Sequence, residues 1–167
     1  MSGGGTAVVE MSRLRWWDLE EVLPIEAALF GADAWTAGQF WSELARVPET
    51  RWYVLAREGG RVVGYAGLFQ AGEEADVQTV AVARRDQGRG IGRRLVEELA
   101  GAARARGAAV LHLEVRADNA AARGLYEESG FAVVGRRPDY YGRGRDAVLM
   151  SRRLSGAVPT ATEGTHG

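Results

Sequence analysis

The stretch that most constrains the fold runs from Asp76 to Arg93, with the sequence DVQTVAVARRDQGRGIGR. Its first part, residues 76–82, is rich in β-branched side chains and predicts a strand. Glycines at 88, 90 and 92 predict a loop, and apolar residues at helical spacing from Ile91 onward predict a helix. Because glycine bends easily and has no Cβ, such a loop can point several backbone amides at one spot. The helix N-terminus adds partial positive charge, so the loop suits a phosphate or pyrophosphate.

The glycine pattern alone leaves other interpretations of this loop open. A tight strand-to-helix connection without a ligand is common. A P-loop is excluded, because no Gly-Lys-Ser/Thr follows and the chain contains no lysine. A dinucleotide-binding fingerprint matches at Gly88 and Gly90, but Arg93 occupies its third glycine position. Arginines at 89, 93 and 94 are expected to deepen the positive potential of the loop.

Composition narrows the classes of function. The 167 residues, 46% of them hydrophobic, suffice for the core of one domain. The absence of cysteine removes disulfides, thiolate catalysis and cysteine metal sites, and we expect no metal. No secretion signal or apolar run of membrane length is visible, which fits a cytoplasmic protein. A net charge of −1 gives no reason to expect nucleic acid or a membrane as partner. The sequence leaves the oligomeric state open between a monomer and a weak dimer.

The order of the predicted elements argues against the dinucleotide-binding fold. We expect residues 1–6 to be a disordered lead-in, 7–153 one domain and 154–167 a disordered tail. Within the domain the patterns predict strands at 7–14, 52–57, 61–70, 76–82, 109–116, 131–135 and 146–152, and helices at 18–30, 36–47, 91–107 and 119–129. The strands at 52–57, 61–70 and 76–82 follow one another through short turns and form a meander. A Rossmann domain would have βαβ units there instead.

The first two predicted helices carry more detailed expectations. Asp18 is a good N-cap for the first helix, and Pro24 should kink or break it. Thr36 should cap the second helix. Its buried face should carry Phe40, Leu44 and Trp41.

Four segments, in this order along the chain, resemble the GCN5-related N-acetyltransferase (GNAT) family. They are VAV at 80–82, QGRGIGR at 87–93, LEVRADN at 113–119 and LYEESGF at 125–131. FGADAW at 30–35, RRPDYY at 136–141 and DAVLM at 146–150 are further similar to its RimI-like members, the ribosomal-protein-alanine N-acetyltransferases. The likeness spans about residues 8–153. It implies an α/β (α+β) acyl-CoA N-acyltransferase fold, with a mixed, mostly antiparallel sheet of six to seven strands flanked by about four helices.

The resemblance also implies acetyl-CoA as the acyl donor, released as CoA. It assigns the pyrophosphate to the backbone of Gln87, Gly88, Arg89, Gly90, Ile91, Gly92 and Arg93, in agreement with the amide-rich loop inferred above. It assigns the pantetheine arm to Val80, Ala81 and Val82, where the strands near Val82 and Glu114 splay apart in this fold. Asn119, an N-cap by its own position, would also hydrogen-bond the cofactor.

Acyl transfer from a thioester to an amine requires the amine to lose a proton. The resemblance assigns the general base to Glu114, acting through a water. From the residues alone, the simpler interpretation is a solvated strand-end acid paired with Arg116 or Arg136. His112 shares the strand face of Glu114 and is an alternative base, but nothing in the sequence orients it. We therefore expect a core or interface histidine at 112.

The departing thiolate must gain a proton. Tyr126 lies seven residues after Asn119, two helical turns on, so both side chains lie on one side of the helix. A phenol there can protonate the CoA thiolate. The simpler interpretation of Tyr126 alone is an aromatic ring packed beside Leu125 and Phe131.

Trp35, Tyr140 and Tyr141 fall in the two loops that flank the acceptor site in the family. They would form walls around a peptide N-terminus, unless they only pin their loops. The leading hypothesis is an acetyl-CoA-dependent Nα-acetyltransferase for a protein N-terminus, the N-terminal alanine of small-subunit ribosomal protein eighteen. One alternative keeps the chemistry but has a small amine as acceptor: a polyamine, an amino acid or an antibiotic. The other is a non-catalytic acyl-CoA-binding module.

Overall fold

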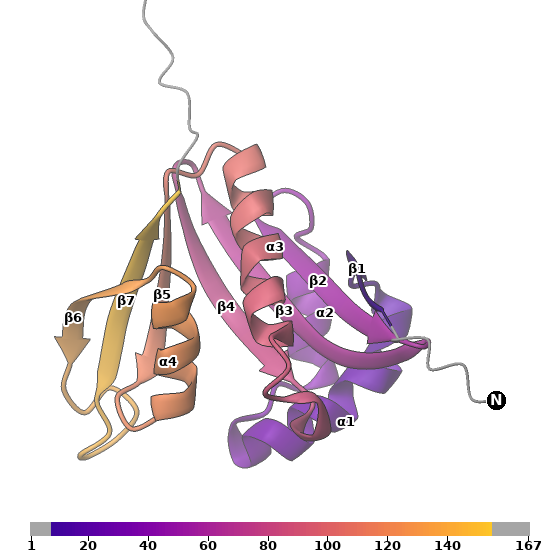
Figure 1. The fold of residues 1–167 in the computed structure, drawn as a ribbon, viewed down its shortest axis with the longest axis horizontal. Coiled ribbons are helices and arrows are strands. Elements are labelled where there is room, and N and C mark those ends of the chain that lie inside the picture. Colours follow the sequence, from indigo (N-terminus) through magenta and orange to yellow (C-terminus); the bar gives the residue numbers. More distant parts are fainter. Residues whose placement is uncertain (1–7, 155–167) are drawn as a thin grey trace, which may run out of the picture.

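A computed structural model describes residues 8–154, so the expectations for residues 1–6 and 155–167 lie outside the described part. Seven strands form one sheet in the order β1-β2-β3-β4-β5-β7-β6 (Figure 1). Their bounds are β1 (Val9–Arg13), β2 (Arg51–Glu58), β3 (Arg61–Ala71), β4 (Glu74–Val82), β5 (Val110–Arg116), β6 (Ala132–Arg137) and β7 (Ala147–Arg153). The four α-helices of the described part are α1 (Leu19–Phe30), α2 (Ala37–Leu44), α3 (Ile91–Ala105) and α4 (Ala120–Glu128). Short 3-10 turns are η1 (Trp16–Asp18), η2 (Gly31–Asp33) and η3 (Arg84–Asp86). The predicted fold class is confirmed.

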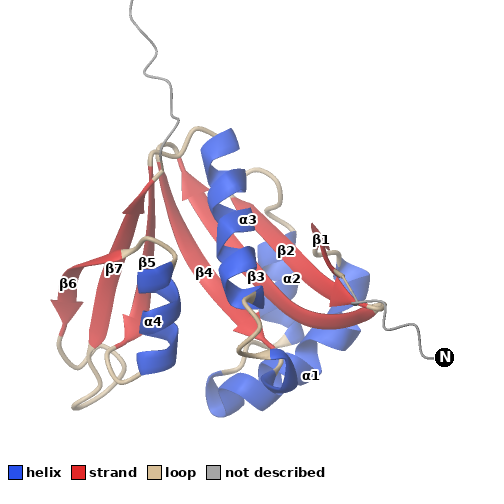
Figure 2. Cartoon of the chain, in the orientation of Figure 1, coloured by secondary structure: helices blue, strands red, loops and turns tan. Residues whose placement is uncertain are grey.

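Two layers of helices cover the sheet, one on each face (Figure 2). α3 and α4 pack on the face whose core includes Leu95, Leu99 and Leu113. α1 and α2 pack on the other face, around Val22, Phe40 and the aromatic rings of β2 and β3. The apolar residues of α3 recur at helical spacing and are buried, whereas its arginines and glutamates between them are exposed. Burial of these apolar faces fixes both helix layers on the sheet.

The neighbouring strands β4 and β5 separate after a short shared stretch. Every strand pair is antiparallel except this one, which is parallel and pairs only Glu74–Asp76 with Val110–His112. Just beyond it, the register between β3 and β4 skips Gln78, which marks a β-bulge in β4. A bulge bends its strand, so β4 turns away from β5. The two strands diverge toward one end of the sheet, and the opening between β4 and β5 denotes this separation of their backbones (Figure 1).

Three expectations for the first two helices need correction. α1 continues without a break through Pro24, which faces solvent and removes a single backbone bond, while the buried Val22 and Glu26 hold the inner side of the helix. Trp41 is 48% exposed and stacks on Trp16 at 5.7 Å, because its neighbour Phe40 occupies the core position. Asp18 does precede α1, but its carboxylate accepts from the Arg15 amide and pairs with Arg57 instead of capping α1.

Two predicted helix caps are confirmed. Thr36 Oγ1 accepts a hydrogen bond from the Gln39 amide, and the Gln39 side chain accepts one from the Thr36 amide in return. Asn119 Oδ1 accepts from the Ala122 amide at 3.1 Å and starts α4. Between residues 8 and 154, no helix is long and apolar enough to cross a membrane.

Candidate functional site

The loop at the start of α3 presents six consecutive backbone amides without a partner. The amides of residues 88–93 donate no hydrogen bond within the described chain, since the first helical bond there runs from the Arg94 amide to the Gly90 carbonyl. Gly90 is the N-cap of α3 with φ +80°, and Gly88 has φ +78°. These left-handed conformations are open to glycine and strained for other residues. The loop and the helix end thus form a cluster of donors suited to a pyrophosphate.

Ion pairs hold this loop against the β2–β3 hairpin. Asp86 is buried and accepts from both terminal nitrogens of Arg61, at 2.8 and 3.0 Å, and from Arg89 at 3.1 Å. Arg89 also pairs with Glu58. The hydrogen bonds from Arg61 lower the pKa of Asp86, with the nearby arginine charges adding to the effect against the opposing influence of burial. The Arg89 guanidinium is therefore bound to carboxylates of the protein itself.

The expected contribution of three arginines to the potential of the loop needs correction for Arg89. Arg89 is neutralised by its two carboxylate partners, and Arg94 donates to the Val9 carbonyl at 3.0 Å. Arg93 is exposed and makes no side-chain hydrogen bond to any residue between 8 and 154. Arg93 is the one of the three with a guanidinium available to a ligand.

The edge of β4 that faces the opening carries Val80, Ala81 and Val82. These residues pair with β3 on their other side, at Ala66, Tyr65 and Gly64. No strand of the described chain pairs with them on the side of β5. The Gln87 side chain donates to the Val82 carbonyl at 3.0 Å and links this edge to the glycine loop. An extended ligand can therefore add to β4 here as a further strand would.

At Gly92 the backbone of the loop lies close to the Leu125 side chain of α4. A Cβ on Gly92 would lie 3.1 Å from Leu125 and 3.7 Å from Val82. The absence of a side chain at this position lets the first turn of α3 lie directly against α4 and the end of β4. The third glycine of the pattern thus serves packing, while the first two serve the turn.

Glu114 lies on β5, two residues beyond its last pairing with β4. Leu113 and Val115 point into the α3–α4 core, so Glu114 lies on the opposite face of the sheet. Its carboxylate is 3.3 Å from Arg137, and its side chain is 32% exposed. Arg116 pairs instead with Asp118, and Arg136 with Asp146, so both partners expected from the sequence are wrong.

His112 has clear orienting partners, contrary to the sequence-based expectation. Its Nδ1 lies 2.6 Å from Ser151 Oγ, and its Nε2 lies 3.5 Å from a carboxylate oxygen of Glu74. It is paired across the strands with Asp76. Burial raises the pKa of Asp76, Glu74 and Glu114 raise it further, and the His112 charge opposes them. A polar cluster therefore occupies the apex of the opening, on the face that carries Glu114.

Tyr126 of α4 lies on the other face of β5, within the α3–α4 core. Its ring packs edge-on against Phe131 at 5.8 Å. Burial raises the pKa of Tyr126 to about 12, so the phenol is protonated at neutral pH. The hydroxyl makes no hydrogen bond within residues 8–154, which leaves its proton free for a ligand. Asn119 uses its side-chain oxygen to cap the same helix.

The aromatic residues expected at the acceptor site lie in two connections of the chain. Tyr140 and Tyr141 contact edge-on at 5.0 Å, and the guanidinium of Arg137 lies 5.4 Å from the Tyr140 ring while it pairs with Glu114. Burial raises the pKa of Tyr141, and the Glu114 charge adds to this effect. The β6–β7 loop is thereby brought to Glu114. Trp35 lies in the α1–α2 connection, where its ring packs edge-on against Phe40 at 5.3 Å.

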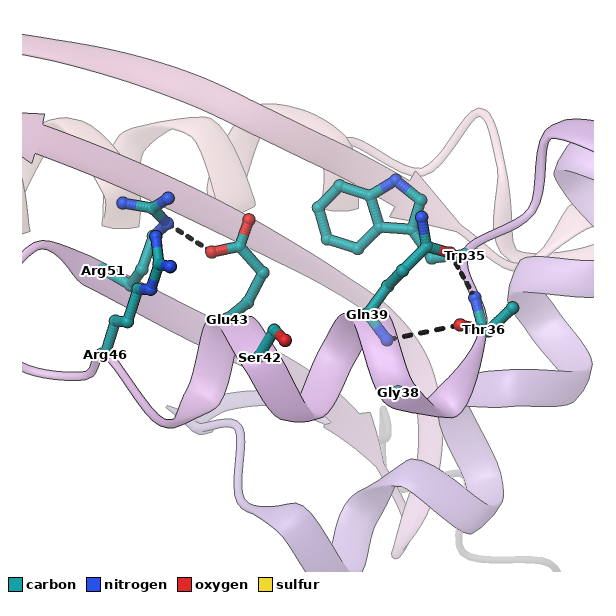
Figure 3. Close-up of a pocket in the computed structure, with 8 residues that line it drawn as sticks. All are labelled: Trp35, Thr36, Gly38, Gln39, Ser42, Glu43, Arg46 and Arg51. Carbon is teal, nitrogen blue, oxygen red and sulfur yellow. Dashed lines mark hydrogen bonds and ion pairs between the residues drawn. The ribbon is translucent and has the colours of Figure 1, made fainter.

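Arg116 lies two residues after Glu114 on β5 and pairs with Asp118. The pKa of Arg116 is raised first by its hydrogen bond to Asp118, and further by the charges of Asp33 in η2 and Tyr141 in the β6–β7 loop. A separate groove of about 480 Å³ runs along α2 from Trp35 to Arg46 and Arg51 (Figure 3). Between residues 8 and 154, no group of three or more histidine, aspartate or glutamate side chains could hold a metal ion.

Several residues of this site were not identified from the sequence. The sequence predicts Asp76 only as the start of a strand, although its position between Ala75 and Val77 places it on the polar face. Arg137, Ser151 and Asp86 gave no sequence signal, because their roles depend on which strands become neighbours.

A family model of acetyltransferases, "Acetyltransferase (GNAT) family", matches residues 10–131. The chain belongs to the GNAT family. The N-alpha-acetyltransferase RimI of Mycobacterium tuberculosis is 44% identical over 153 residues, which cover 88% of this chain and 94% of that protein. The crystal structure of the ribosomal-protein-S18-alanine N-acetyltransferase of Escherichia coli superimposes with a TM-score of 0.79 at 32% identity, covering 92% of this chain and 98% of that one. Ard1 of Thermoplasma volcanium gives the same TM-score at 25% identity, covering 89% and 99%. The GNAT resemblance inferred from the sequence is confirmed.

Proposed function

We propose that this chain is an acetyl-CoA-dependent Nα-acetyltransferase that acts on a protein N-terminus, the N-terminal alanine of ribosomal protein bS18. The observation that carries the proposal is the run of free amides at 88–93 beside the opening between β4 and β5. The relatives support the acceptor, since one is named as an N-alpha-acetyltransferase and another as an S18-alanine N-acetyltransferase. The proposed compartment is the cytoplasm.

The acyl donor fits the glycine loop and the free edge of β4. In the proposed complex the amides of residues 88–93 hold the pyrophosphate, with Arg93 adding a charge-assisted contact. The segment Val80–Val82 lies along the pantetheine arm, and Val80 and Val82 direct their backbone groups away from β3, with the Val82 carbonyl occupied by Gln87. Gln87 steadies the turn between these two segments through the Val82 carbonyl, and Asn119 lies at the start of the neighbouring α4. The thioester then lies in the opening beyond Asp76 and His112.

In the proposed mechanism the general base and the general acid lie on opposite faces of β5. The acceptor amine attacks the thioester carbonyl, its nitrogen bonds to the acyl carbon, and the carbon–sulfur bond breaks. Glu114, on the α1–α2 face, accepts the amine proton through a water. Tyr126, on the α3–α4 face, donates its proton to the thiolate. A base and an acid placed on opposite sides of one opening can act on opposite sides of one reacting carbonyl.

The acceptor enters from the side of Glu114 in this proposal. Trp35 of the α1–α2 connection and Tyr140 and Tyr141 of the β6–β7 loop form the walls around its first residues. Arg137 shields the Glu114 carboxylate until the acceptor ammonium group arrives. Asp76 adds a second carboxyl group at the apex of the opening.

The test is acetylation of defined amines, followed by mass spectrometry. The purified protein is incubated with acetyl-CoA and an alanine-starting peptide, the same peptide with a blocked N-terminus, and a panel of polyamines, amino acids and aminoglycosides. We expect one acetyl group on the free N-terminus and none on the blocked peptide. Acetylation of a small amine with the peptide left unmodified would assign the acceptor to the small-molecule class. CoA binding without turnover of any amine would indicate a non-catalytic binding module.

A further inference from the structure

A buried carboxylate with no role in the proposed chemistry lies beneath the α1–α2 connection. Glu26 of α1 is only 2% exposed, and no arginine lies within ion-pair distance of it among the described residues. The Tyr65 hydroxyl of β3 donates to its Oε2 at 3.1 Å, and the backbone amide of Trp35 faces the same carboxylate. Burial raises the pKa of Glu26, and these two donors oppose the shift. Burying an ionised carboxylate costs free energy unless hydrogen bonds or a paired charge compensate for the lost water.

The contacts around Glu26 form a closed circuit. Glu26 accepts from Tyr65, the Tyr65 ring packs edge-on against Phe40 at 6.0 Å, Phe40 packs against Trp35 at 5.3 Å, and the Trp35 amide returns to Glu26. Phe40 and Tyr65 are fully buried. The circuit joins α1, α2 and β3 to Trp35. No residue from Gly31 to Thr36 is fully buried, and the Trp35–Phe40 contact attaches this connection to the core.

The circuit also reaches the edge of the opening. Tyr65 is the cross-strand partner of Ala81, the middle residue of the β4 segment that faces the opening. The position of Trp35 is therefore set relative to the strand that borders the site. A displacement of Trp35 by about 1 Å can cost a large factor in rate, because the reacting groups must meet in one geometry.

We propose that Glu26 is a positioning residue for the acceptor, which fixes the α1–α2 connection by accepting a hydrogen bond from Tyr65, whose ring packs through Phe40 onto Trp35, and by facing the Trp35 amide. This inference rests on the proposed function, in that Trp35 forms a wall of the acceptor site. Glu26 itself does not touch the acceptor or the acyl donor. Glu26 acts by holding the α1–α2 connection in one geometry.

Two variants separate hydrogen bonding from charge. Glu26→Gln keeps an oxygen that can accept from the Tyr65 hydroxyl and face the Trp35 amide, whereas Glu26→Ala removes both interactions. We expect Glu26→Ala to raise the KM for the acceptor roughly tenfold with the KM for acetyl-CoA changed less than about twofold. Glu26→Gln should restore acceptor KM to within about threefold of the parent. Leu99→Ala, which leaves a cavity on the α3 side of the sheet, is the control for lost stability and should leave acceptor KM unchanged.

Hydrogen exchange gives a readout that does not depend on the acceptor. In the protein without ligand, Glu26→Ala should accelerate amide exchange in residues 31–36, and Glu26→Gln and Leu99→Ala should not. The kinetic comparison uses whichever amine the parent acetylates. If the peptide is not a substrate, the proposed function is refuted, and the Glu26 variants are still compared with the amine that is acetylated. Unchanged exchange in Glu26→Ala, or equal rises in KM for acceptor and acetyl-CoA, would overturn the inference.

Discussion

Asp76 and His112 form the last pair at which β4 and β5 are in register. Beyond them β4 turns away at the bulge of Gln78, and Glu114 of β5 is left facing the opening. The same short pairing therefore creates the free edge of β4 and exposes the proposed base. The placement of Glu114 and Tyr126 on opposite faces of β5 then follows from the alternation of strand residues and the docking of α4.

Glu114→Gln should lower kcat by roughly 10²–10⁴-fold, the usual contribution of a positioned general base. The loss should be greatest below the pH optimum, where few acceptor amines are already deprotonated. CoA affinity, measured by calorimetry, should stay the same, because Glu114 does not contact the glycine loop. Glu127→Gln, an exposed glutamate on α4, is the matched control and should keep parental kcat.

His112 provides the competing assignment of the base, since Ser151 and Glu74 orient its ring. His112→Gln should reduce kcat much less than Glu114→Gln in the same peptide assay. If His112→Gln abolished turnover while Glu114→Gln matched the parent, the base would be His112.

Tyr126→Phe should lower kcat about a hundredfold, because in the proposed mechanism the phenol supplies the proton for the thiolate. Phenylalanine keeps the packing against Phe131, so CoA affinity should be nearly unchanged. Since burial raises the pKa of Tyr126 to about 12, the phenol stays protonated through the ordinary assay range. A variant with parental turnover would exclude Tyr126 as the acid.

Gly90→Ala should weaken CoA binding, because Gly90 has φ +80° and a left-handed alanine costs roughly 1–2 kcal/mol. Relief of that strain would turn the amides away from the pyrophosphate. The expected loss is about tenfold in Kd, measured by calorimetric titration with CoA. Gly101→Ala on the exposed side of α3 is the control: it meets nothing within 4 Å and should raise stability while leaving Kd unchanged. Equal Kd values for all three proteins would remove the loop from the binding site.

Asp86→Asn should lower the melting temperature by several degrees near neutral pH and loosen the glycine loop, because Asp86 accepts from Arg61 and Arg89. The pKa of Asp86 is lowered in the fold, chiefly by the Arg61 hydrogen bonds. Its stabilisation is therefore complete above the unfolded pKa of 3.8 and is lost as the pH falls through the lower folded value. Thermal scans between pH 3 and pH 8 should show parent and variant converging in acid. A constant difference across this range would contradict the ion-pair role.

The sequence predicted those features that depend on local chain chemistry. The strand–glycine loop–helix unit, the caps at Thr36 and Asn119 and the meander were all predicted, since each depends on residues close in sequence. The exposure of Trp41 and the continuity of α1 through Pro24 were not, because packing between elements decides them. The partner of Glu114 was missed for the same reason: Arg137 reaches it only once β6 and β5 flank β7.

The central claim is that the amides of residues 88–93 grip the pyrophosphate of the acyl donor. Hydrogen–deuterium exchange with and without CoA measures those amides themselves, provided that short overlapping peptides resolve the loop. The account predicts slower exchange in residues 88–93 when CoA is bound, with weaker protection in Gly90→Ala and no change in the β2–β3 turn at Gly59 and Gly60. Exchange in residues 88–93 that stays the same at saturating CoA would contradict it.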